Sequence, residues 1–108
     1  MRPYQESTGT NPKHVQWGGD RYDDAQAFDV PAGATATVSM RGKGALLEST
    51  DDGESFHVAR DTAGRLIQTD TAIGGVHLSQ SKFARLIKPD VAHGVPLLCE
   101  MTVQPVAA

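Results

Sequence analysis

The sequence predicts an all-β protein, a small antiparallel β-sandwich of jelly-roll-like type with about seven to eight short strands and an extended N-terminal arm. Two observations lead to this prediction. Short runs in which apolar and polar residues alternate recur about every ten residues, and none keeps the 3.6-residue period of a helix. The 108 residues also include 11 Gly and 6 Pro, scattered without a period, which suits many turns between short strands.

Residues 45–59 predict the central hairpin. Apolar residues on either side, such as Leu46 and Val58, enclose the polar turn Asp51-Asp52-Gly53. An Asp-Gly pair between apolar runs is a strong short-range hairpin signal.

The other strands follow from alternation between turns. Residues 35–40 and 97–103 alternate most cleanly, so each should bury one face. Pro89 should end the strand before it, and a short helix over 81–87 is the alternative there. Besides the hairpin, we expect strands at residues 28–30, 35–40, 65–69, 76–79, 82–88 and 97–103.

Residues 1–26 differ from the rest, being polar, with Gly and Pro, and having no sustained period. We therefore divide the chain into an extended arm, residues 1–26, and a β-sandwich domain, residues 27–108. The arm carries Tyr4, Trp17 and Tyr22, three of the six aromatic residues. We expect these three to bind a partner; the alternative is that the arm folds back and caps its own sheet.

Composition excludes several classes of function. A net charge of −3 without a basic block argues against nucleic acid. No apolar run reaches transmembrane length, and no apolar segment of a secretory signal follows the first residues, so we expect a product made in the cytoplasm that binds no membrane. A single cysteine, Cys99, cannot form an intrachain disulfide, and its alternating apolar run predicts a buried, inert thiol.

No catalytic pattern stands out. The four histidines lack the H-x-x-x-H or H-x-H spacing of a local metal site, so we expect no metal and no cofactor. No G-x-S-x-G elbow is present. The carboxylates near the arm should form a solvated or partner-facing surface, and we predict that the protein is not an enzyme. The four histidines are His14, His57, His77 and His93, and the carboxylates near the arm are Asp20, Asp23, Asp24 and Asp29.

Residues 49–56, STDDGESF, resemble the Asp-box of sialidases, with the pattern Ser-x-Asp-x-Gly-x-Thr-Trp. The resemblance implies a structural turn, in which the aspartate binds backbone amides and the aromatic ring packs under the hairpin. It does not imply sialidase activity, since a propeller needs several blades. A calcium site at the turn acids is disfavoured, because the EF-hand spacing is absent. The residues carried over are Ser49, Asp51, Gly53, Ser55 and Phe56.

Residues 30–38, VPAGATATV, together with 49–56 resemble the small β-sandwich decoration and accessory proteins of tailed bacteriophages. The resemblance implies a non-enzymatic virion structural protein, a capsid decoration (cement) protein that stabilises the assembled head. Its partners would be the major capsid protein or other virion subunits, and it would form a homo-oligomer. Attachment would use the arm and exposed sheet edges.

A carbohydrate-binding β-sandwich module is the alternative, as is a head-fibre or tail accessory protein. Sugar sites usually offer exposed aromatic platforms. The aromatic residues of the body, Phe28, Phe56 and Phe83, fall at expected core positions, which counts against sugar binding.

Overall fold

A computed structural model describes residues 4–6, 13–19, 26–91 and 97–104. In these residues the regular elements are ten strands, and every strand pair is antiparallel, so the predicted all-β class is confirmed. The strands are β1 (Tyr4–Glu6), β2 (Lys13–Gly19), β3 (Phe28–Val30), β4 (Thr35–Gly42), β5 (Gly44–Ser49), β6 (His57–Val58), β7 (Gln68–Thr69), β8 (Ala72–His77), β9 (Arg85–Val91) and β10 (Leu97–Gln104). Each strand from β3 onward overlaps a predicted strand, but β8 begins at Ala72, in residues expected to form a loop, and shares only residues 76 and 77 with the predicted strand 76–79. Strands β1 and β2 come from the predicted arm.

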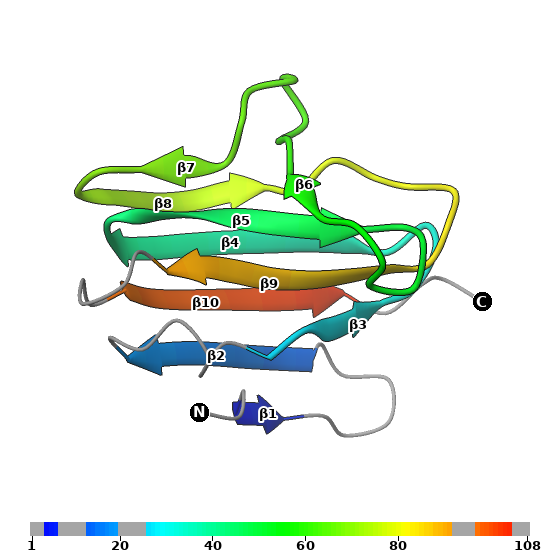
Figure 1. Ribbon diagram of the computed structural model, residues 1–108, viewed down its shortest axis with the longest axis horizontal. Helices are drawn as coiled ribbons and strands as arrows, with labels where there is room; N and C mark the ends of the chain where they lie inside the picture. Colours follow the sequence, from blue (N-terminus) through cyan, green and yellow to red (C-terminus); the bar gives the residue numbers. More distant parts are fainter. Residues whose placement is uncertain (1–3, 7–12, 20–25, 92–96, 105–108) are drawn as a thin grey trace.

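The strands form two sheets (Figure 1). Sheet A has the order β1-β2-β10-β4-β8, and sheet B has the order β3-β9-β5-β6, with β7 also pairing with β5. Strands β2 and β4 lie in sheet A, whereas β3 and β5 lie in sheet B. In the same way, β8 and β10 lie in sheet A, whereas β9 lies in sheet B. Neighbours within a sheet are therefore mostly distant in sequence.

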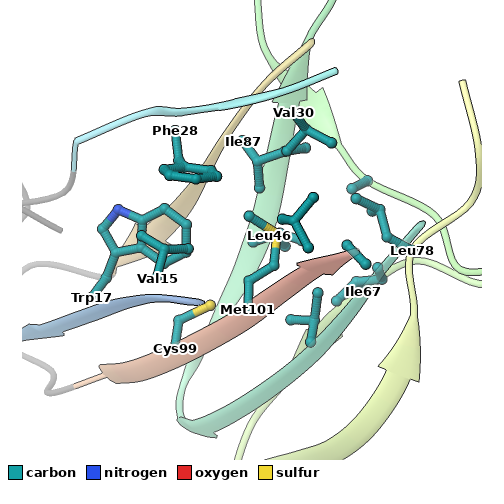
Figure 2. Close-up of a cluster of buried hydrophobic side chains, with 14 of the residues drawn as sticks. Val15, Trp17, Phe28, Val30, Leu46, Ile67, Leu78, Ile87, Cys99 and Met101 are labelled. Atoms are coloured by element: carbon teal, nitrogen blue, oxygen red, sulfur yellow. The ribbon is translucent and has the colours of Figure 1, made fainter. Parts of the chain in front are cut away.

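The core lies between the buried faces of the two sheets. Strand β10 buries every second residue, as its alternation predicts, and Cys99 lies in the core as expected. Figure 2 shows side chains of both sheets in one cluster, including Val15 of β2 and Leu46 of β5. Each large apolar side chain buried in this way contributes about 1.5–3 kcal/mol.

Strand β2 corrects the predicted boundary at residue 26. It pairs with β10 along its whole length and lies inside sheet A, so residues 13–19 belong to the folded body. Trp17, expected in a partner-binding arm, is only 3% exposed and lies in the core; its Nε1–H donates to the Gln26 carbonyl at 2.5 Å. Val15 and Trp17 alternate with polar neighbours over just a few residues, and this alternation is too short to predict a strand from the sequence.

Strand β9 corrects a second prediction, because it continues through Pro89 to Val91. Pro89 pairs with Leu46, whose own N–H and carbonyl bond to Ile67 and Ala59, away from β9. The missing proline N–H therefore faces the β3 side. Strand β3 pairs only with residues 85–87, so the proline removes no ladder bond there.

Candidate functional site

The turn at residues 49–55 is held by its own serine and aspartate side chains. The Ser49 hydroxyl donates to Asp51 Oδ1 at 2.6 Å and accepts the Gly53 N–H at 2.9 Å. The Ser55 N–H donates to Asp51 Oδ1 at 2.9 Å, and its hydroxyl donates to Oδ2 at 2.5 Å. The Ser49 hydroxyl, and then the two Ser55 donors, lower the pKa of Asp51 to about 2.

The same turn lies against the outer face of sheet B. Gly53 has a φ of 89°, in the left-handed region, and a Cβ there would lie 3.4 Å from Leu86 Cδ1. Phe56 is half-buried below the turn, with the Lys88 Nζ 4.8 Å from its ring centroid. Both oxygens of Asp51 are thus engaged within the turn, which gives these residues a structural role.

A buried ion pair, not recognised from the sequence, joins β5 and β9, and the exposed His57 of β6 lies beside it. Arg85 is 4% exposed and Glu48 is 8% exposed. The Arg85 Nη1 lies 3.5 Å from Glu48 Oε2, and Nη2 donates to the Ser79 carbonyl. His57 Nε2 lies 3.8 Å from Glu48 Oε1. Burial lowers the pKa of Arg85, although Glu48 opposes this effect. The only feature of the sequence that could have indicated this pair is that Glu48 and Arg85 are polar residues within runs of alternating apolar residues.

Of the three aromatic residues predicted to bind a partner, only Trp17 has a side chain that the structure describes. Trp17 is in the core. Tyr4 lies in β1, where its backbone pairs with Gln16 of β2. Tyr22 lies outside the described residues, as do Asp20, Asp23, Asp24 and His93.

The most exposed aromatic side chain in the described part of the chain is Phe83, at 69%. It was expected in a strand and in the core, but β9 begins two residues later, so Phe83 belongs to the connection from β8 to β9. Ser81 fixes this connection: its carbonyl accepts the Gly33 N–H at 2.8 Å and its hydroxyl accepts the Phe83 N–H at 3.1 Å. The ring is therefore presented to solvent on an anchored loop.

Strand β8 is an edge of sheet A, and four of its six residues are exposed. Residues 60–62 cover the end of this edge near His77, whose carbonyl accepts the Thr62 N–H at 3.0 Å. Near the other end, Gly42 N–H donates to the Thr71 carbonyl at 2.7 Å, and the next pair is Arg41 with Ala72. Because bonded pairs alternate in an antiparallel ladder, the Ala72 N–H and carbonyl point away from β4, toward the side of β8 on which no described strand pairs.

A bulge shapes this edge. The register shifts between Val38 and Met40, and Gly75, with a φ of 62°, donates its N–H to the Ser39 hydroxyl at 3.0 Å. A Cβ on Gly74 would meet nothing within 4 Å. A shallow groove of about 500 Å³ adjoins the strand, and its lining includes Arg41, Gly74, Leu98 and Glu100.

A second cleft, of about 560 Å³, lies where β7, β5 and β9 meet. It is lined by Lys43, Gly44, Ala45, Gln68, Thr69, Asp70 and Asp90. These side chains are mostly polar and carry both signs of charge.

Among the described residues, no three or more of His, Cys, Asp and Glu gather in a way that could hold a metal ion. The described part of the chain also has no helix long and apolar enough to cross a membrane. No protein-family model, curated protein or solved structure matches the chain.

Proposed function

We propose that this chain is a non-enzymatic bacteriophage virion structural protein, a capsid decoration protein that attaches to the assembled head and stabilises it. The observation that carries the proposal is the β8 edge, which presents backbone groups beside a groove. Attachment adds an extended segment of the major capsid protein, or of another virion subunit, to sheet A.

The small residues of β8 favour this mode of attachment. Gly74 has no positive φ, and a Cβ there would meet no described atom within 4 Å, so nothing in the described part of the chain requires glycine at this position. A glycine in a strand lets another backbone approach closely. Leu98 offers an apolar contact in the adjoining groove, with Arg41 and Glu100 able to pair with charges on the arriving segment.

The strand order supports a jelly-roll-like β-sandwich. Without β1, the two sheets read β2-β10-β4-β8 and β3-β9-β5-β6. Viral capsid and lectin domains share this architecture. Many identical copies on a shell would multiply a modest contact at each β8 edge into a large stabilisation.

The test is cosedimentation of the purified chain with virus particles grown in the host of this gene. Wild-type protein should bind saturably, and Gly74→Lys should lose at least tenfold in affinity, because a long charged side chain blocks the edge. Thr50→Lys is the matched control, since Thr50 is exposed on the turn that lies against sheet B, away from the β8 edge. Equal binding by both variants would overturn edge attachment, and no binding by wild type would overturn the decoration role.

A carbohydrate-binding module is the second candidate function. The polar cleft between β7 and β9 favours it, although none of its described lining residues is aromatic.

A further inference from the structure

The cleft at the junction of β7, β5 and β9 takes no part in the Asp51 turn or the β8 edge. The register places Gln68 opposite Ala45 on one side and Asp90 opposite Ala45 on the other. Leu46, the next residue of β5, points into the core. Alternation therefore turns the row Gln68–Ala45–Asp90 onto the outer face of sheet B.

In this row the small side chain of Ala45 lies at the bottom of the cleft, and the polar side chains of Gln68 and Asp90 lie on either side of it. Strands β7 and β9 flank β5, so they stand about 9.6 Å apart, or two strand spacings. Ala45 leaves the space between Gln68 and Asp90 unfilled, and Lys43 and Asp70 also line the cleft. A volume of about 560 Å³ is within the range of small-molecule sites.

The lining selects a class of ligand. Asp70 and Asp90 disfavour an anion, and because Lys43 offsets one of the two carboxylates, the net charge of −1 attracts a cation only weakly. Among the residues that the structure describes, no apolar side chain larger than alanine lines the cleft, so an apolar ligand would gain little. What remains is a neutral molecule that donates hydrogen bonds to the carboxylates and accepts them from Lys43 and Gln68.

We propose that this cleft binds a neutral polyhydroxylated ligand of about the size of one hexopyranose ring. Hydroxyl groups both donate and accept, so one sugar ring can pair with Asp90 on one wall and Gln68 on the other. Each hydrogen bond contributes about two- to tenfold in affinity, so we expect a dissociation constant of about 1–10 mM for a single ring.

This inference rests on the second candidate function and is independent of capsid attachment. The cleft lies on sheet B, whereas β8 is an edge of sheet A. Gly74→Lys should leave sugar binding unchanged, and cleft variants should leave binding to particles unchanged, so either proposal can fail alone.

The experiment is a nitrogen-15 NMR titration of the full chain with the methyl α-D-pyranosides of glucose, galactose and mannose, each raised to about 50 mM. At least one should give saturable shifts at the amides of Gly44, Ala45 and Thr69. Asp90→Asn and Gln68→Ala should each weaken binding about fivefold. Asp52→Asn, an exposed acid on the hairpin turn, is the matched control and should bind as wild type does.

Three results would overturn the proposal. The first is the absence of local shifts with all three sugars. The second is binding that both cleft variants leave unchanged. The third is saturable binding of N-acetylarginine amide at the same amides without any sugar response, which would make the cleft a cation site.

Discussion

Changing Glu48→Gln leaves the buried guanidinium of Arg85 without its counter-ion. At the observed 3.5 Å, the Coulomb attraction is about 4.7 kcal/mol with an effective dielectric constant of about 20. The Gln amide oxygen can still accept a hydrogen bond, so we expect a loss of about 3 kcal/mol, at the lower end of the range for breaking buried ion pairs. For a chain of this length, this lowers Tm by about 13 °C.

The assay is thermal and denaturant unfolding at neutral pH, with Glu54→Gln as the matched control. Glu54 is exposed on the turn, so its variant should stay within about 0.5 kcal/mol of wild type. Replacing the pair together, with Glu48→Leu and Arg85→Met, should recover most of the loss, because no buried charge remains. Equal stability of Glu48→Gln and Glu54→Gln would show that the charge of Glu48 does not stabilise the fold.

Four further predictions concern other parts of the fold. Gly53→Ala should cost about 1–2 kcal/mol, because φ is 89°, whereas Gly74→Ala should be neutral or slightly stabilising; equal Tm shifts would contradict this. The pKa of Asp51 is lowered from 3.8 to about 2, so its stabilisation is complete above about pH 4 and is lost as the pH falls through 2. Denaturant unfolding across this range should show that Asp51→Asn flattens the acid slope, and an unchanged slope would count against the turn. Burial raises the pKa of Cys99 to about 12, so a thiol reagent at about pH 8 should react only after unfolding; rapid labelling of native protein would argue otherwise. Deleting residues 1–26 removes β2 with Trp17, so the truncated protein should show no cooperative unfolding when followed by circular dichroism. A truncated protein that folds would instead support the prediction that residues 1–26 form a separate arm.

The sequence was most informative where local chemistry decides the structure. The turn around Asp51 could be predicted because its donors lie within a few residues and Gly53 supplies the positive φ. The strand at Leu97–Gln104 could be predicted because each inward position is apolar. Both patterns depend on neighbours in sequence, and no distant residue has to be known.

Predictions failed where a distant strand decides the outcome. Trp17 is in the core because β2 pairs with β10, some eighty residues away in the register. Pro89 fits inside β9 because β3 is too short to reach it. Phe83 is exposed because the chain there crosses from sheet A to sheet B, which its alternation with Arg85 did not reveal.

The candidate sites depend still more on the fold. Nothing near Glu48 in the sequence indicates that Arg85 will lie beside it. Gln68, Ala45 and Asp90 are brought together only by the register of β7 and β9 on β5. The Ala72 edge likewise appears only once the order of sheet A is known.

We propose that the chain is part of a virion. The most direct measurement is quantitative mass spectrometry of gradient-purified particles from cells that carry the gene, without added protein. We predict that the chain comigrates with the heads at a fixed ratio to the major capsid protein, unchanged on repeated banding. Its absence from the particles, or a trace amount that falls with each round, would contradict the proposed function.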